Sequence, residues 1–360
     1  MNFFDTGAHI TYLLRTVKYR FKHICEYSLL RAVCAAVRIL PERGALWLAA
    51  GLSKIIRVIL RKRMIEAEKR AREVLGPSRT DQEIRQIVRS SLHTLVLNGI
   101  ELMRIPQRED SWFDDHIVNP EAIQPLKAHL HSTGRGAILA ACHMGNWHLA
   151  AVAMNHLLVP IFFLVAHQRN PLTNRFFNQM LAQAGGEGIC RETGSMRSII
   201  RNLRSGKVLA ITPDVRSKSS AVAVDYLGGQ ANIPEGMALF ARQTDVPIFP
   251  CSTVREGLSH HRWTVHQPIF PDHSLPKTTD IQRMTQAVLR TIEADVRAHP
   301  EQYFWLNKRW ILEPLPARPT ATDIPSPEQR QSQTDTGAAQ RRRAHADVPI
   351  MGLQNITDNI

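Results

Sequence analysis

The feature that most constrains this chain is an apolar run at residues 137–142 that ends abruptly at His143. Gly145 and Asn146 follow the histidine, and Trp147 then opens a segment that can be helical. This order is typical of a buried strand that delivers a side chain to the carboxyl edge of a sheet, where open α/β sheets bind their ligands. Histidine accepts a proton near neutral pH, so we interpret His143 as a candidate general base.

From about residue 135 onward, short apolar runs alternate with segments of helical periodicity. This alternation predicts an α/β fold with a mainly parallel or mixed central sheet flanked by helices. The predicted strands are 137–142, 161–166, 207–211, 222–226, 246–254 and 262–269. The predicted helices between and after them are 171–184, 195–204, 234–244 and a segment around 281–296.

The rest of the chain divides by composition. Residues 1–105 are predicted to be a basic, amphipathic helical region that docks on a membrane, broken at Pro41 and with a helix cap at Thr80–Glu83. Residues 106–314 are predicted to be the α/β domain. Residues 315–360 are rich in Pro, Ala, Thr, Gln and Ser, which is typical of a disordered tail.

The chain of 360 residues has a formal net charge of +13, which indicates an anionic partner. The basic side chains around residues 54–63 lie beside an apolar helical stripe. They are either the solvated face of a core-packed helix or a surface that rests on anionic lipid, and both readings stay open. The five cysteines are scattered, which fits buried thiols in a reducing compartment. We expect neither a cleaved leader nor a membrane-spanning helix.

Several short segments, taken in order, carry a resemblance to a known family over about residues 12–313. The segments are HMGNW at 143–147, NP at 170–171, LRSGK at 203–207, PD at 213–214, YLGG at 226–229, IPEG at 233–236, VPIFP at 246–250 and PEQYFWLNKRW at 300–310. Together they resemble the lipid A biosynthesis acyltransferase family, which is related to the lysophospholipid acyltransferases.

This resemblance implies transfer of a fatty acyl group from acyl carrier protein or acyl-CoA to a hydroxyl of a lipid A precursor or a related glycolipid. It implies no cofactor. The enzyme would work at the cytoplasmic face of the cell inner membrane, as a peripheral or monotopic protein on an anionic surface. We expect a hydrophobic groove for the acyl chain to run from His143 toward the N-terminal helices.

The family signature is a histidine followed, after four residues, by Asp or Glu, and here His148 takes the place of the carboxylate. A neutral imidazole can orient His143 but brings no negative charge to stabilise an imidazolium. Three outcomes are open. A carboxylate from elsewhere, Asp214 or Glu192, compensates; the enzyme runs slowly on a His–His pair; or the chain is a catalytically weakened homologue that binds lipid. The predicted catalytic set is His143, His148 and Asp214.

Other polar residues near predicted strand and helix ends are candidates for substrate binding. Arg216, Arg242 and Arg255 can bind phosphates of the acceptor or of the donor, or can pair with carboxylates of the chain itself. Gly145 and Asn146 form the strand-to-helix turn and are candidate donors to the oxyanion of the intermediate.

Two alternative functions are less favoured by the sequence. Metal binding would draw on Cys142, His143, His148 and His167, but the two neighbouring histidines are five apart and lack the spacing of a helical zinc motif, so we expect no metal. Nucleic-acid binding is compatible with the charge, but no recognisable motif or aromatic platform is present, so we expect no nucleic-acid partner.

Overall fold

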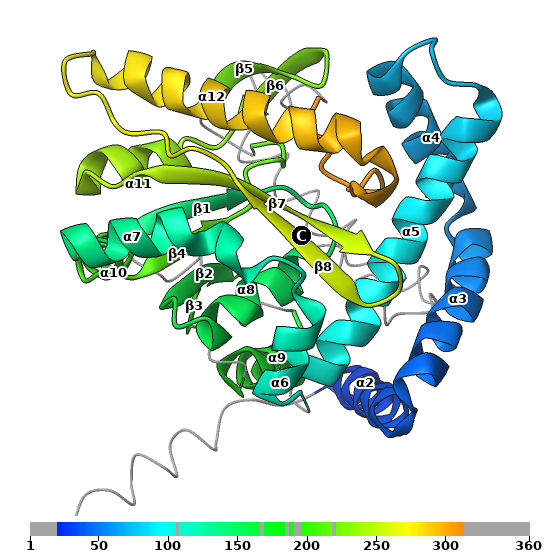
Figure 1. Ribbon diagram of the computed structural model, residues 1–360. Coiled ribbons are helices and arrows are strands. Elements are labelled where there is room, and N and C mark those ends of the chain that lie inside the picture. Colours follow the sequence, from blue (N-terminus) through cyan, green and yellow to red (C-terminus); the bar gives the residue numbers. More distant parts are fainter. Residues whose placement is uncertain are drawn as a thin grey trace, which may run out of the picture.

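The computed structural model of the chain describes residues 20–105, 108–165, 169–183, 187–190, 196–217 and 221–312. Within these residues, a six-stranded sheet has the order β3-β2-β4-β1-β7-β8, with only β8 antiparallel to its neighbour (Figure 1). Its strands are β1 (Ala137–Ala141), β2 (Ile161–Val165), β3 (Glu187–Cys190), β4 (Val208–Ile211), β7 (Ile248–Glu256) and β8 (His260–Val265). The predicted α/β class with a mainly parallel sheet is confirmed.

The central strand β1 is apolar along its whole length because both faces of the sheet are covered. Ile138 and Ala140 belong to one hydrophobic cluster, whereas Ala137 and Leu139 belong to another. This split follows from the two-residue period of a strand. A strand that packs on both sides reads as a continuous apolar run, which is the pattern of the sequence here.

Helices cover the two faces of the sheet in separate groups. One face carries α10, α11 and α12, of which α11 contacts β1 and α12 contacts β7. The other carries α8, with α6 and α7 beside it (Figure 1). The bounds are α6 (Asp110–His116), α7 (Gln124–Thr133), α8 (Trp147–His156), α9 (Pro171–Gln183), α10 (Met196–Arg204), α11 (Gly236–Thr244) and α12 (Lys277–Ala298), with two short 3₁₀ turns at Pro120–Ile123 and Pro300–Gln302.

Four N-terminal helices gather on one side of the sheet, drawn blue to cyan in Figure 1. They are α2 (Phe21–Ile39), α3 (Glu42–Ile59), α4 (Arg61–Leu75) and α5 (Asp81–Arg104). The predicted break at Pro41 separates α2 from α3, and α5 begins with the predicted capping box of Thr80 and Glu83. Helix α5 contacts α3, α4 and α8, so it connects this group to the α/β part.

Several elements were not anticipated from the sequence, and α6 and α7 are two of them. Strand β3 follows directly after the glycine pair at 185–186, and β6 (Gly229–Ile233) pairs with β5 (Val222–Tyr226) in a separate antiparallel hairpin. No helix in the described ranges is both long and apolar enough to span a bilayer. The predicted tail at 315–360 lies outside the described residues, and the division at residues 105 and 314 stays a prediction.

Candidate active site

His143 and Asp214 meet at the carboxyl edge of the sheet. His143 follows β1 and Asp214 follows β4, and these two strands are parallel neighbours. Oδ1 of Asp214 lies 2.6 Å from Nδ1 of His143, while Oδ2 accepts the backbone N–H of His143 at 2.8 Å. Both side chains are buried, with 4% and 1% of their surface exposed. One carboxylate therefore fixes both the backbone and the ring of the histidine.

The contact with Asp214 determines which nitrogen of His143 can act as a base. A carboxylate only accepts hydrogen bonds, so Nδ1 carries the hydrogen and donates it to Asp214. The lone pair of the neutral imidazole then lies on Nε2. When Nε2 takes up a proton, the adjacent carboxylate stabilises the imidazolium that forms. The pair thus has the arrangement that general-base chemistry requires.

Aromatic rings surround the imidazole of His143. The ring of Trp147 lies edge-on to it, with 5.0 Å between centroids, and Phe304 lies at 6.3 Å. The backbone N–H of Phe304 also donates to the carbonyl of His143 at 2.9 Å, so the 300–310 segment is held against the turn that contains His143. Apolar walls of this kind exclude water and strengthen the interaction between His143 and Asp214.

His148 lies beside this pair and not between its members. It sits in the first turn of α8, half-buried, with its ring 4.9 Å from that of Trp147. Burial, followed by the electrostatic effect of the nearby His143, lowers the pKa of His148 to about 4. His148 is therefore neutral at physiological pH. The nitrogen Nδ1 of His143 is bound by Asp214, so the structure gives His143 a carboxylate partner that lies far from it in the sequence.

Other titratable groups around Asp214 are held in their neutral forms. Burial, and then the charge of Asp214, raises the pKa of Tyr303 and of the Cys142 thiol well above their usual values. The Tyr226 phenol, buried in the same region, is shifted in the same direction by burial and then by the neighbouring Tyr303. A thiol held protonated is a poor nucleophile, so Cys142 acts here as a packed apolar group.

The polar groups of the turn between β1 and α8 form hydrogen bonds with other groups of the protein. Gly145 has a φ of +55°, and a Cβ at this position would lie 2.1 Å from the carbonyl oxygen of Thr253, so only glycine fits. The backbone N–H of Gly145 donates to the carbonyl of Gln302 at 3.2 Å. The side chain of Asn146 caps α8 by accepting from the N–H of Leu149. We therefore leave Gly145 and Asn146 out of the proposed substrate contacts and assign them to the turn.

A buried ionic cluster supports this turn from the side of α5. Glu101 accepts two hydrogen bonds of 2.5 Å from Arg255 and one of 2.6 Å from the amide of Asn146. Asn98 accepts from Arg255 at 2.9 Å and donates to the carbonyl of Gly145 at 2.5 Å. Burial opposes the charge on Glu101, but its hydrogen bonds from Arg255, together with the nearby His261 ring at 3.6 Å, outweigh burial and lower its pKa to about 2.

The three arginines that were candidates for substrate binding have different surroundings. Arg255 is committed to the buried cluster with Glu101, and Arg242 donates to Asp280 at 2.5 Å and to the carbonyl of Asp272 at 2.7 Å. Both guanidinium groups act within the protein, and we do not include them in the proposed substrate contacts. Arg216 is half-buried just after Asp214, and its backbone N–H donates to the carbonyl of Arg309 at 3.4 Å. Arg216 remains in the proposed set.

Part of the predicted site lies outside the described residues, namely Glu192 and His167. Among the residues that the structure describes, no group of three or more His, Cys, Asp or Glu side chains is placed to hold a metal ion. The acyl groove between His143 and the N-terminal helices stays a prediction.

Sequence reasoning missed Glu101 and gave no role to Tyr303. Glu101 is a single carboxylate in the otherwise apolar stretch of 100–103, and that isolation was the one available signal that it is buried and paired. Tyr303 and Phe304 stand inside the segment that carried the family resemblance, but nothing local in the sequence indicates that this segment folds back onto His143.

Comparison with known proteins finds relatives that are named as acyltransferases. The chain is 25% identical over 236 residues to a phosphatidylinositol mannoside acyltransferase of Mycolicibacterium smegmatis, which is 63% of this chain and 73% of that protein. It is 27% identical over 194 residues to the protein of the same name from Mycobacterium tuberculosis, which is 51% of this chain and 57% of that protein. The matched regions thus span from just over half to about three quarters of these relatives.

The family comparison covers more of the chain. Residues 15–311 match the family described as bacterial lipid A biosynthesis acyltransferase. That range contains the N-terminal helices, the whole sheet, and both His143 and Asp214. The chain is therefore an acyltransferase of the bacterial lipid A biosynthesis acyltransferase family.

Proposed function

We propose that this acyltransferase moves a fatty acyl group from an acyl thioester to a hydroxyl of a membrane glycolipid, with His143 as the general base. The observation that carries the proposal is the 2.6 Å contact between Nδ1 of His143 and Oδ1 of Asp214 at the carboxyl edge of the sheet. The family acts on lipid-like substrates. The identities of the acyl donor, the acceptor and the general base are our proposals.

In the proposed reaction, Nε2 of His143 takes the proton from the acceptor hydroxyl as its oxygen attacks the thioester carbonyl. The carbonyl π electrons move onto oxygen and give a tetrahedral oxyanion. The intermediate then re-forms the carbonyl and breaks the carbon–sulfur bond. The leaving thiolate takes the proton from the imidazolium, so the products are an ester and a free thiol.

Asp214 is a positioning residue in this scheme. It holds the tautomer of His143 that leaves Nε2 free of hydrogen, and its negative charge stabilises the imidazolium formed during the reaction. The two aromatic rings of Trp147 and Phe304 lower the local dielectric constant, which makes that electrostatic stabilisation larger than it would be in water.

Two acceptor classes follow from the relatives. The family is described by lipid A biosynthesis, and the two mycobacterial relatives are named for phosphatidylinositol mannoside. Both names denote phosphorylated glycolipids with free hydroxyls. We propose an acceptor of this class, a lipid A precursor or a related glycolipid, and a donor that is either acyl carrier protein or acyl-CoA.

We further propose that the protein works as a peripheral or monotopic protein on an anionic bilayer, at the cytoplasmic face of the inner membrane. The support is a set of exposed apolar side chains on α2, α3 and α4. These helices gather on one side of the sheet (Figure 1). The exposed side chains are Phe21, Ile24, Leu29, Val33, Ile39, Trp47, Ile55, Val58, Ile59 and Ile65. Basic residues are interspersed among them, which favours binding to anionic lipid.

The proposed function is tested by transfer of a radiolabelled acyl group to the lipid fraction of the host cell. We expect His143→Ala to abolish transfer, because it removes the proposed base from the end of β1. Asp214→Asn should lower kcat on the order of 10⁴-fold, by analogy with neutralisation of a triad aspartate.

His273→Ala is the matched control, because Nε2 of His273 also contacts a carboxylate, Asp245, at 3.2 Å, but Asp245 precedes β7 at the edge of the sheet opposite to His143. This variant should transfer at the wild-type rate. Undiminished transfer by His143→Ala would overturn the assignment of the base. Mass spectrometry of lipids from cells with and without the gene would then identify the acceptor and the acyl chain.

A catalytically weakened, lipid-binding homologue is the second candidate. Its support is the replacement of the family's carboxylate by His148. The presence of Asp214 on His143 favours the active enzyme, since the charge that His148 lacks is supplied from β4. If the wild-type chain were inactive and His148→Glu gained activity, the weakened homologue would be the better account.

A further inference from the structure

Strand β7 is longer than β1, the neighbouring strand that leads to His143. Its pairing with β1 ends where Cys251 lies opposite Ala141, whereas β7 itself continues to Glu256. Among the strands that the structure describes, none pairs with this last part of β7 on the side of β1. Arg255 lies there and is buried, and buried peptide groups are costly to leave without hydrogen bonds. Another part of the chain therefore has to supply partners for its main chain.

Gln302 supplies these partners through its side chain. The backbone N–H of Arg255 donates to Oε1 of Gln302 at 2.7 Å, and Nε2 of Gln302 donates to the carbonyl of Arg255 at 2.9 Å. One carboxamide thus offers both an acceptor and a donor. The side chain of Gln302 therefore does for β7 what the peptide groups of an adjacent strand would do.

The backbone of Gln302 pairs with the turn that follows β1. The carbonyl of Gln302 accepts the N–H of Gly145 at 3.2 Å, and the N–H of Phe304 donates to the carbonyl of His143 at 2.9 Å. The two residues between these hydrogen bonds form an antiparallel bridge. Gln302 thus contacts β7 through its side chain and the turn through its main chain, so it fixes the position of one relative to the other.

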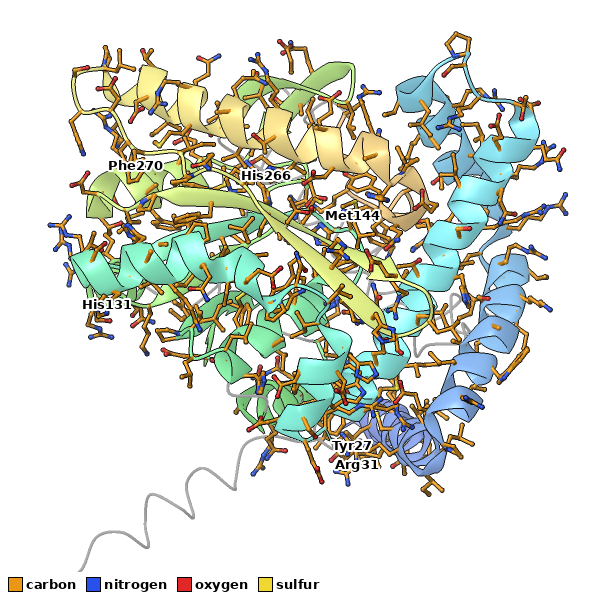
Figure 2. All side chains as sticks on the ribbon, viewed as in Figure 1. Tyr27, Arg31, His131, Met144, His266 and Phe270 are labelled. Atoms are coloured by element: carbon orange, nitrogen blue, oxygen red, sulfur yellow. The ribbon has the colours of Figure 1, made fainter. Side chains whose placement is uncertain are left out.

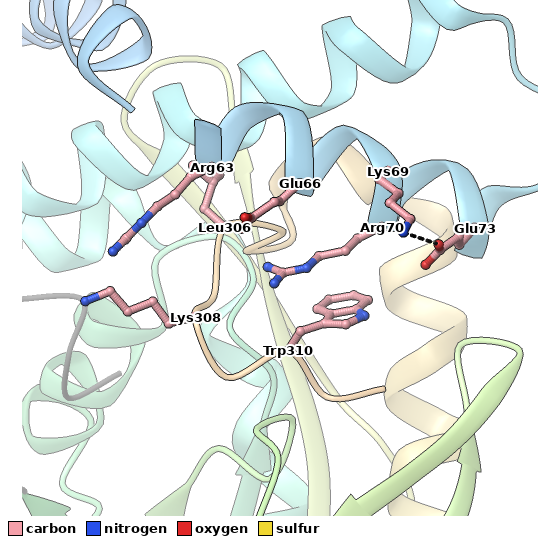
Figure 3. Close-up of a pocket in the computed structure, with 8 residues that line it drawn as sticks. All are labelled: Arg63, Glu66, Lys69, Arg70, Glu73, Leu306, Lys308 and Trp310. Carbon is pink, nitrogen blue, oxygen red and sulfur yellow. Dashed lines mark ion pairs between the residues drawn. The ribbon is translucent and has the colours of Figure 1, made fainter. Parts of the chain in front are cut away.

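The segment 302–310 is itself anchored to the N-terminal helices. The hydroxyl of Ser91, on α5, donates to the carbonyl of Tyr303. The guanidinium of Arg70, on α4, donates to two carbonyls further along the segment, at 2.7 and 3.2 Å. It also lies 5.3 Å from the centroid of the Trp310 ring (Figure 3). The segment is therefore a fixed support against which the turn is held.

The position of the turn determines the contact between His143 and Asp214. Nδ1 of His143 lies 2.6 Å from Oδ1 of Asp214, and a hydrogen bond weakens steeply once its angle departs far from linear. Asp214 follows β4 and not β1, so a shift of the turn moves one partner and leaves the other in place. A misplacement of about 1 Å at a reacting group lowers a rate by up to about 10²-fold.

We propose that Gln302 is a positioning residue for acyl transfer. By pairing with both β7 and the turn, it holds His143 at its contact with Asp214. This inference rests on the proposed function, in which His143 is the base. It assigns Gln302 an effect on turnover that acts through His143, and no contact with the substrate.

The test compares the full-length wild type with Gln302→Met, which has a side chain of similar size but loses both hydrogen bonds to Arg255. We expect kcat to fall about 10–100-fold and KM to change by less than about threefold, because the base is misplaced while the substrate contacts remain.

The second measurement is proton NMR of the same proteins without substrate. The hydrogen on Nδ1 of His143 is bound to a carboxylate, so it should give a resonance far downfield, identified by its loss in His143→Ala. In Gln302→Met this resonance should weaken or move upfield, because the turn no longer holds the ring against Asp214.

Gln286→Met is the matched control. The N–H of Asp225 donates to Oε1 of Gln286 at 2.8 Å, and Nε2 of Gln286 donates to the carbonyl of Asp225 at 2.9 Å. The variant therefore removes the same pair of hydrogen bonds from β5, which belongs to the hairpin apart from the six-stranded sheet. Its kcat and its downfield resonance should equal those of the wild type.

If Gln302→Met is poorly folded, Gln302→Asn replaces it. Asparagine keeps the carboxamide, but its side chain is one methylene shorter, so it reaches Arg255 only if the segment moves. It should still lower kcat by about threefold or more and still weaken the resonance.

A wild-type kcat in the folded variant would overturn the proposal, as would a fall in kcat with an unchanged resonance or an equal fall in Gln286→Met. A raised KM at unchanged kcat would make Gln302 a substrate contact instead. If His143→Ala kept transfer, the proposed base would be wrong, but a changed resonance in Gln302→Met would still show that Gln302 positions His143.

Discussion

At the scale of single residues, His143 has a carboxylate partner that follows β4 and does not come from the position five residues downstream. The family signature places an acid five residues after the histidine, and this chain has His148 there. Asp214 contacts His143 through both oxygens, one on the ring and one on the backbone. Because the carboxylate of Asp214 already places a negative charge beside His143, position 148 does not have to supply one. A neutral imidazole is therefore accommodated there.

His148 is expected to make stability depend on pH. Its pKa is about 4 in the folded chain and 6.5 without the fold, so the unfolded state binds more protons between these values. Stability therefore falls as pH drops from 6.5 toward 4. Between pH 7 and pH 5, this residue alone should remove about 2 kcal/mol of the free energy of unfolding.

The measurement is urea unfolding of the wild type and of His148→Gln at both pH values. Other titrating groups contribute equally to the two proteins, so the difference between them isolates His148. The variant should lose less stability on acidification than the wild type. Equal losses would mean that position 148 is protonated as readily in the folded chain as in the unfolded one.

At the scale of elements, the turn that follows His143 is positioned by contacts from α5 and β7 and not by its own sequence alone. Glu101 on α5 and Arg255 on β7 form a buried pair whose polar atoms also hold Asn146, while Asn98 holds the carbonyl of Gly145. A buried pair of this kind is costly to break, because the remaining charge cannot be solvated. The network therefore fixes the position of the turn that follows His143.

Removing one member of this pair should cost both stability and rate. Glu101→Gln leaves Arg255 buried without its full counter-charge and should destabilise the fold by about 3 kcal/mol. The double variant with Arg255→Gln should be less destabilised than the sum of the two single variants, as measured by denaturant unfolding. Glu109→Gln, at an exposed position, is the control.

The same single variant should lower kcat, because the turn that carries His143 loses a support. Additive effects of Glu101→Gln and Arg255→Gln on stability would show that the two residues are not coupled. An unchanged kcat in a destabilised variant would limit the network to a structural role.

Most of the helices and strands could be predicted from the sequence, whereas the contacts between residues far apart in the sequence could not. The strands at 137–142 and 161–166 and the helix caps follow from local pattern, and the structure places them within a residue or two. Arg255, by contrast, reads as a surface cation, because its partner Glu101 is 154 residues away. Asp214 was named only as one of two candidates, because pairing across parallel strands depends on the sheet order.

At the scale of the whole molecule, the chain carries a net charge of +13 and gathers exposed apolar side chains on one group of helices. Trp47 and Val58 are 75% and 72% exposed on α3. They are separated by about three helical turns, so they lie on the same side of the helix.

This arrangement predicts that membrane binding depends on the apolar side of α3. Full burial of a large apolar side chain in lipid contributes about 1.5–3 kcal/mol, so Trp47→Ser/Val58→Ser should weaken binding to anionic vesicles by on the order of 10²-fold. Vesicle flotation measures the change in binding.

Phe270→Ser is the control, since Phe270 is also exposed (54%) but lies at the far end of the molecule from α2 and α3 (Figure 2). Because both α3 side chains are exposed in the folded chain, the free energy of unfolding should change by less than about 0.5 kcal/mol. Equal flotation of all three proteins would place the membrane contact elsewhere, and a shift of a nucleic-acid fragment in place of flotation would favour the other anionic partner that the charge allows.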